Sequence, residues 1–195
     1  MKNKILKTTA KIIRVITVPP VMIALLIILL TACTDSVFVR PWDVVVAILT
    51  LAFIPLLAYP LSYAVPRWRA KGRECQRKIA LILTPISYLI GIIYGFISGC
   101  SRGAMMIFTG YFISASALLF FNFALSVRAS GHACCVAGPI LYASYWLGLP
   151  AVIAGAVLYP AVAWASISMK RHTPREFILG TLVSCAAFAL SVIIW

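Results

Sequence analysis

Two apolar runs flank a short polar island in the stretch LPAVIAGAVLYPAVAWASISM (149–169), KRHTPRE (170–176) and FILGTLVSCAAFALSVIIW (177–195). Each apolar run is close to the roughly 20 residues that a helix needs to cross the hydrocarbon core of a bilayer. Neither run alternates as a strand does, and inside lipid only helices and closed barrels satisfy the backbone hydrogen bonds. The stretch therefore predicts two membrane helices joined by a polar loop.

The rest of the chain repeats this pattern. Hydrophobic residues make up 63% of its 195 residues, and the mean hydropathy is +1.04, which excludes a soluble domain. The apolar runs lie near 19–39, 44–65, 79–98, 104–127, 133–147, 149–169 and 177–195, and 133–147 is the shortest. We count seven spans and expect an all-α membrane protein, a bundle of six to seven transmembrane helices forming one domain over residues 19–195.

Residues 1–18 differ from the spans. Apolar residues recur there at helical spacing, and basic residues fill the opposite face: Ile5, Leu6, Ile12, Ile13 and Ile16 against Lys4, Lys7, Lys11 and Arg14. This pattern predicts an amphipathic helix lying on anionic lipid headgroups. Pro19-Pro20 removes two backbone donors and disfavours helix just before it, so the chain should turn there into the first span. The alternative is one continuous kinked helix that begins near Ile12.

The basic residues indicate the orientation. In the seven-span arrangement every Lys and Arg except Arg40 and Arg102 falls on one side of the membrane. Short loops rich in Lys and Arg stay in the cytoplasm. We therefore expect a multi-pass protein of the cell membrane with its N-terminus inside and its C-terminus outside. The six cysteines form no CxxC or CxxH pair, so the sequence predicts no metal site, no cofactor and no disulfide framework.

The only two histidines both return to the basic side of the membrane. Ser130 is a good N-cap for the helix that carries His132, and Thr173-Pro174-Arg175-Glu176 is typical of a capping box directly after His172. Helix N-termini among Lys and Arg favour anions, above all phosphate. Glu176, four residues after His172, can orient that imidazole and raise its basicity.

These residues carry a resemblance to a family. Lys71-x6-Lys78, Ser130-Gly131-His132 and His172-x3-Glu176 followed by Gly180, in this order on one face, resemble the three signature segments of the type-2 phosphatidic acid phosphatase superfamily. That family shares its fold with vanadium haloperoxidases, and the resemblance covers roughly residues 66–182.

The resemblance implies hydrolysis of a phosphomonoester through a phosphohistidine, without a metal. His172 would be the nucleophile, Glu176 would orient it, and His132 would protonate the leaving alkoxide. The residues that would hold phosphate oxygens are Lys71, Lys78, Ser130 and Gly131.

Each of the three segments departs from the family pattern. Lys78-Ile79 stands where the first segment ends Arg-Pro, and Ala129 stands where the second begins with Pro. Ser166 stands where the third segment carries an Arg, six residues before the nucleophile. The missing guanidinium would remove a bidentate clamp on the transferring phosphoryl group. Basic residues nearby that could replace it in binding phosphate are Arg128, Arg171 and Arg175.

The expected function is that of a membrane phosphatase acting on phosphatidic acid, phosphatidylglycerol phosphate or a polyprenyl phosphate or diphosphate. Its expected partners are this lipid substrate and anionic headgroups, and no nucleic acid. One alternative is a non-catalytic relative that binds or translocates anionic headgroups, and another is a structural subunit of a larger complex. A lipid synthase with a carboxylate-bound divalent metal is disfavoured, because the basic side offers only Glu74 and Glu176.

Overall fold

The computed structural model describes the backbone of residues 2–70 and 72–195 and the side chains of residues 5–70, 72 and 74–195. Within this part of the chain all regular structure is helical. The elements are α1 (Lys2–Ile16), α2 (Pro19–Cys33), α3 (Pro41–Ala47), the π-helix η1 (Ile48–Phe53), α4 (Ile54–Leu56), α5 (Ala58–Ala64), α6 (Pro66–Arg69), α7 (Gly72–Ser98), α8 (Arg102–Phe123), α9 (Gly131–Leu147), α10 (Leu149–Ser168) and α11 (Pro174–Ile194). The predicted all-α class is confirmed.

Several of these helices have the length and composition of membrane spans. Among the described residues five stretches are long and apolar enough: Pro41–Ala64, Glu74–Ser98, Arg102–Phe123, Leu149–Ser168 and Pro174–Ile194. The bent pair of α1 and α2 raises the number to six if it counts as one span. Large apolar side chains remain exposed on the outer helices, as contact with lipid requires: Ile97, Val157 and Ile193. The chain is therefore a multi-helix membrane bundle.

The predicted count of seven spans exceeds the number of helices with full length. α2 has 15 residues and α9 has 17, both fewer than the roughly 20 needed to cross the hydrocarbon core. α2 stops at Cys33 because Thr34 adopts an extended backbone, so the predicted run 19–39 is only partly helical. α9 stops at Gly148, whose φ of 68° suits glycine and reverses the chain directly into α10.

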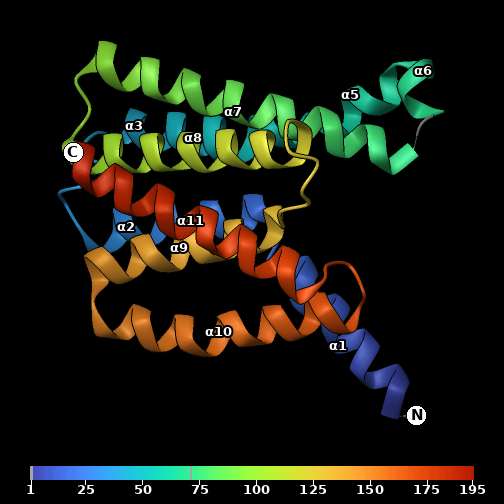
Figure 1. Ribbon diagram of the computed structural model, residues 1–195. Helices are drawn as coiled ribbons and strands as arrows, with labels where there is room; N and C mark the ends of the chain where they lie inside the picture. Colours follow the sequence, from blue (N-terminus) through green and yellow to red (C-terminus); the bar gives the residue numbers. More distant parts are fainter. Residues whose placement is uncertain (1, 71) are drawn as a thin grey trace.

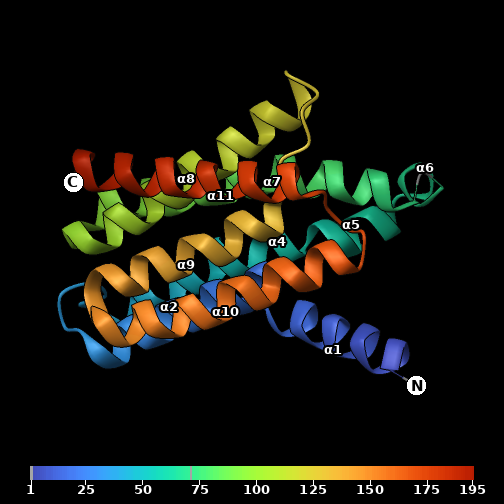
Figure 2. The same cartoon turned by 60° about the horizontal axis from the view of Figure 1, so that its bottom comes forward.

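The N-terminal helix turns at the two prolines as expected. α1 and α2 meet at 55°, with Val18 extended and Pro19 and Pro20 opening α2. The predicted turn is therefore present, and α1 and α2 do not form one continuous helix. Figure 2 shows α1 diverging from the bundle at its N-terminal end while its other end lies against α10.

One face of α1 is packed into the protein, which the amphipathic pattern did not predict. Ala10 and Thr17 are buried, and Arg14, which lies between them in the sequence, is partly buried. The spacing i, i+4, i+7 places these three side chains on one face of the helix. The expectation that Arg14 faces lipid headgroups together with Lys7 and Lys11 is therefore wrong for Arg14, because the contact with the bundle turns this face inward.

The long helices lie side by side with their loops at two ends (Figure 1). α8 contacts α7 and α11, and α9 contacts α2, α10 and α11. The start of α7, the loop between α8 and α9 and the loop between α10 and α11 all lie toward the end where the N-terminus is found. We call this end the basic end. The fold thus brings the two histidine-containing segments to one end of the bundle.

Candidate active site

His172 lies in the loop between α10 and α11, next to a capped helix start. Thr173 is the N-cap of α11: its Oγ1 accepts a hydrogen bond from the backbone N of Glu176 at 3.2 Å, and its own backbone N donates to Glu176 Oε2 at 3.4 Å. The same Oε2 lies 3.0 Å from Nδ1 of His172. The predicted capping box is present, and one carboxylate oxygen serves both the helix start and the imidazole.

The contact with Glu176 determines which nitrogen of His172 carries the proton. A carboxylate accepts hydrogen bonds and donates none, so Nδ1 is the donor and Nε2 keeps its lone pair. Burial lowers the pKa of His172 below its ordinary value, Glu176 opposes this, and the charges of Arg14 and Arg128 add to the lowering. At neutral pH Nε2 is therefore unprotonated, which is the nucleophilic form of histidine.

His132 lies in the first turn of α9, just after the N-cap Ser130, and is held by α1. Its Nε2 lies 3.2 Å from Oγ1 of Thr17, whose hydroxyl donates to the carbonyl of Ile13 at 2.7 Å. Because that hydroxyl has a single proton, Thr17 accepts from His132, and Nε2 carries the hydrogen. Burial lowers the pKa of His132 to about 4, and the charges of Arg14 and His172 contribute. The imidazole is neutral at neutral pH.

The starts of α9 and α11 are packed backbone to backbone, which brings the two histidine segments together. The backbone N of Ser130 donates to the carbonyl oxygen of Glu176 at 3.0 Å. Gly180 lies against the carbonyl of Ser130, and a Cβ there would overlap that oxygen. Ser130 itself is fully buried, and its hydroxyl accepts from the backbone N of Ala133 at 3.2 Å as the cap of α9. The hydroxyl of Ser130 therefore has a structural role as the cap of α9.

Gly180→Ala is expected to destabilise the protein by about 1–3 kcal/mol, because the added methyl group meets backbone that cannot rotate away. The matched control is Gly131→Ala, whose Cβ would find its nearest neighbour, Leu118 Cδ1, at 4.0 Å. Thermal unfolding in detergent measures both. An equal melting temperature for Gly180→Ala and the unmodified protein would contradict the close contact between α9 and α11.

Arg14 reaches the site from α1. Its Nη1 donates to Oγ of Ser166 at 2.8 Å, and Ser166 is fully buried near the end of α10. In the described part of the chain no carboxylate lies within ion-pairing distance of Arg14. Arg14 and Thr17 are the contributions to the site that the sequence did not reveal. Their spacing with Ala10 on one helix face was the available signal.

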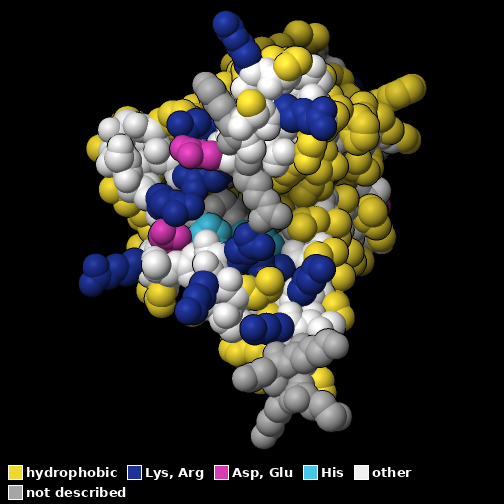
Figure 3. Space-filling model, turned by 90° about the vertical axis from the view of Figure 1, so that its right-hand side faces the viewer, with side chains coloured by type: hydrophobic (Ala, Val, Ile, Leu, Met, Phe, Trp, Pro, Cys, Tyr) yellow, Lys and Arg dark blue, Asp and Glu magenta, His cyan; other side chains and the backbone are white. Residues whose placement is uncertain are grey.

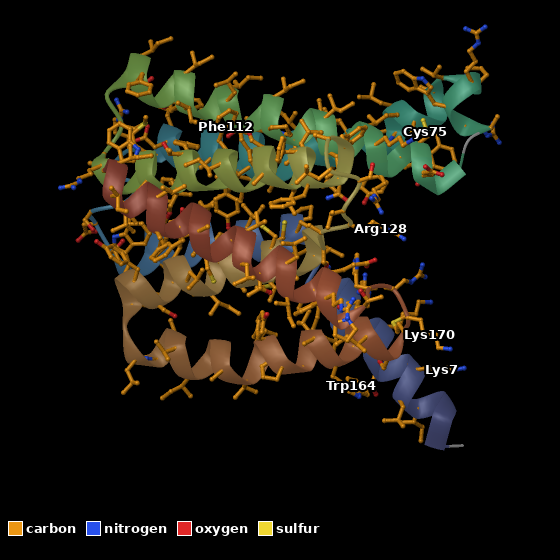
Figure 4. The ribbon with its side chains drawn as sticks, viewed as in Figure 1. Lys7, Cys75, Phe112, Arg128, Trp164 and Lys170 are labelled. Atoms are coloured by element: carbon orange, nitrogen blue, oxygen red, sulfur yellow. The ribbon has the colours of Figure 1, made fainter. Side chains whose placement is uncertain are left out.

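The predicted phosphate-binding residues fall into different places. Arg171 and Gly131 line the same cavity as the histidines, whereas Arg128 is exposed on the loop between α8 and α9 and does not line it. Figure 4 shows Arg128 and Lys170 at the same basic end. Lys78 is exposed, 3.3 Å from Glu74, and also lies outside the cavity lining. Lys71 lies outside the described residues.

A neighbour of Lys78 faces the cavity instead. Arg77 lines it, and its Nη2 donates to Oδ1 of Asn122 on α8 at 2.8 Å. Successive residues of a helix point about 100° apart, so Lys78 and Arg77 cannot both face inward. In the end-on view of Figure 3 the two histidines lie among Lys and Arg side chains. The basic end is therefore a strongly positive surface around the histidines.

A cavity of about 730 Å³ runs from the histidines into the bundle. At the basic end it is lined by Arg14, Arg77, His132, Arg171 and His172. Farther in it is lined by Leu51, Ala115, Tyr142 and Phe188. Since His132 and Tyr142 are ten residues apart on α9, the cavity extends about 15 Å along that helix. The hydroxyl of Tyr111 faces this interior without a hydrogen-bond partner among the described residues.

Comparisons of the chain with protein-family models, with curated proteins and with solved structures find no significant match. The local chemistry is nevertheless well defined. His172 pairs with Glu176, His132 lies in the same cavity, and guanidinium groups from α1 and from the loop before α11 flank them. Unprotonated imidazole nitrogen beside several guanidinium groups can attack an anionic electrophile such as a phosphate ester.

Proposed function

We propose that the protein is an integral membrane phosphatase that removes the phosphate from a membrane lipid, with the chemistry of the type-2 phosphatidic acid phosphatase superfamily that its motifs resemble. The observation that carries this proposal is the 3.0 Å contact between His172 Nδ1 and Glu176 Oε2 at the mouth of a cavity shared with His132. This arrangement provides a nucleophile, its orienting carboxylate and a second imidazole for proton transfer.

The reaction has two steps. In the first, Nε2 of His172 attacks the phosphorus of a phosphate monoanion, the bond to the lipid oxygen breaks, and the proton of the monoanion passes through His132 to the leaving alkoxide. In the second, His132 accepts a proton from water, the water oxygen bonds to phosphorus, and the bond to Nε2 breaks, which releases inorganic phosphate. His132 then gives its proton to the released phosphate and is neutral again. Glu176 stabilises the positive charge that His172 carries while phosphorylated. The side chains of His172, His132 and Glu176 thus return to their starting states.

The cavity supports a lipid as the substrate. Its basic end suits a phosphate, and its apolar walls continue about 15 Å along α9, roughly half of a hydrocarbon core of about 30 Å. A lipid held by its phosphate beside the histidines can therefore place a chain inside the bundle. Phosphatidic acid, phosphatidylglycerol phosphate and polyprenyl phosphates or diphosphates all have this form. The excess of Lys and Arg at the basic end favours a cytoplasmic site, where α1 also meets anionic headgroups.

Phosphate release by the detergent-purified protein tests the proposal. The substrates are phosphatidic acid, phosphatidylglycerol phosphate and undecaprenyl phosphate and diphosphate, with glycerol 3-phosphate as the chain-free comparison. We expect release from at least one lipid and a much lower kcat/KM for glycerol 3-phosphate. Rapid acid-free quenching with radiolabelled substrate should trap a phosphoprotein that is labile in acid and stable in base. Folded protein that releases phosphate from none of these would instead favour a protein that binds or moves headgroups.

Glu176→Gln is expected to lower kcat about 10- to 100-fold, the usual cost of losing the carboxylate that orients and charges a histidine. Gln can retain the length of the side chain and part of the helix cap, so the melting temperature should change little. The matched control is Glu74→Gln on α7, whose carboxylate is exposed and pairs with Lys78. Equal kcat values for Glu176→Gln and Glu74→Gln would contradict the role of Glu176.

A further inference from the structure

We propose that Arg14 of α1 supplies the guanidinium that binds the phosphate of the substrate, so that the N-terminal helix is part of the active site. This inference rests on the proposed function, and it assigns a new role to a residue outside the segments that contain the histidines. Arg14 lines the cavity that holds both imidazoles, and Thr17, three residues later on the same helix, contacts His132.

Among the described residues, the charge of Arg14 has no counterion. The side chain is partly buried, and no carboxylate of the described residues lies within 4.0 Å of it. Arg171 lines the same cavity and carries a like charge. Removing a guanidinium from water beside another positive charge is unfavourable unless an anion joins them. A phosphate between these two groups provides that anion.

The one hydrogen bond of Arg14 positions the group and leaves it free to bind. A guanidinium has five N–H donors in a planar fork that matches two phosphate oxygens. In the described structure only Nη1 is used, in the 2.8 Å bond to Ser166 Oγ. Ser166 is fully buried and neutral, so it fixes the arm without neutralising it. Four donors therefore remain for an anionic ligand.

The packing of α1 against the bundle fixes the position of Arg14. Ala10 and Thr17 flank Arg14 on the face that meets the bundle, and both are buried. α1 contacts α10 along this face, and α10 is the helix that carries Ser166. Lys7 and Lys11 are exposed on the other side of α1. This side remains free to lie on headgroups. One helix can thus both dock on the membrane surface and complete the site.

The test moves the guanidinium from α1 to α10. Arg14→Ala should lower kcat/KM about 100-fold or more, as expected for the loss of one preorganised donor group at a transferring phosphoryl group. Arg14→Lys should recover only part of this, because an ammonium lacks the fork. Since Oγ of Ser166 lies within a hydrogen bond of the guanidinium, Arg14→Ala with Ser166→Arg should recover at least about tenfold over Arg14→Ala. Arg102→Ala, which removes an exposed guanidinium at the opposite end of the bundle, is the matched control and should behave as the unmodified protein.

A second measurement makes the result independent of turnover. Inorganic phosphate should raise the melting temperature of the unmodified protein and of Arg102→Ala at constant ionic strength, and it should not raise that of Arg14→Ala. Full activity in Arg14→Ala, or an unchanged phosphate-dependent shift, overturns the role of Arg14. If the unmodified protein hydrolyses none of the lipids, the proposed function fails, and the shift by phosphate still decides whether Arg14 binds the anion.

Discussion

His172→Ala is expected to lower kcat/KM for the preferred lipid phosphate by about 10,000-fold or more, because no covalent intermediate can form without the nucleophile. Nε2 of His172 is the unprotonated nitrogen of an imidazole whose Nδ1 is held 3.0 Å from Glu176. The remaining groups still bind phosphate, so substrate affinity should change far less than kcat. Phosphate release at saturating lipid and trapping of the phosphoprotein measure the two consequences together.

Two controls separate chemistry from folding in this experiment. Arg102→Ala lies on an exposed position at the start of α8, at the opposite end of the bundle, and should keep full activity. The melting temperature of His172→Ala should stay close to that of the unmodified protein, because the cap formed by Thr173 and the backbone of Glu176 does not use the imidazole. A folded His172→Ala variant that still forms the labelled phosphoprotein would rule out His172 as the nucleophile.

The pH dependence of stability follows from the two imidazoles. Both have a folded-state pKa below the ordinary value, His132 at about 4. Below a pH of about 6.5 the unfolded chain binds protons that the folded protein does not, so stability is present above that pH and is lost as the pH falls toward 4. Unfolding measured from pH 7.5 to 4.5 should show this loss, and it should be smaller in His132→Ala. A profile that is flat in both proteins would contradict the buried neutral state of His132.

Much of the fold could be predicted because lipid allows the backbone few solutions. Apolar runs of membrane length had to be helices, and all seven runs contain helices in the structure. Their lengths were harder to predict, because apolar composition continues through residues 34–39 while the helix stops at Cys33. Where a helix ends depends on local backbone geometry, such as the positive φ of Gly148, which hydropathy does not contain.

The site could be predicted only where it depends on local spacing. His172 and Glu176 are four residues apart at a helix start, so their contact follows from one helical turn. Arg14 could not be predicted in the same way. Its position on a polar helix face is compatible with lipid headgroups, and only the contact of α1 with α10 turns it toward Ser166. One tertiary contact thus places the guanidinium of Arg14 beside Ser166.

His132→Ala is expected to lower kcat about 100- to 10,000-fold for a lipid phosphate, the usual contribution of a positioned general acid. This role requires a source of the proton, because the pKa of His132 is lowered to about 4 and the imidazole carries no extra proton at neutral pH. A phosphate monoanion supplies this proton, which His132 can pass to the leaving oxygen. In the complex the anion also raises the pKa of the imidazole.

This account predicts how the loss depends on the substrate and on pH. The alkoxide of a lipid needs a proton to leave, whereas the p-nitrophenolate of p-nitrophenyl phosphate leaves without one. The loss in His132→Ala should therefore be at least about tenfold smaller for p-nitrophenyl phosphate, while His172→Ala should lose activity toward both substrates. For the unmodified protein kcat/KM should fall as the pH rises above about 6, where phosphate esters lose their second proton. Equal losses on both substrates would remove the acid role from His132 and leave it as a group that positions the phosphate beside His172.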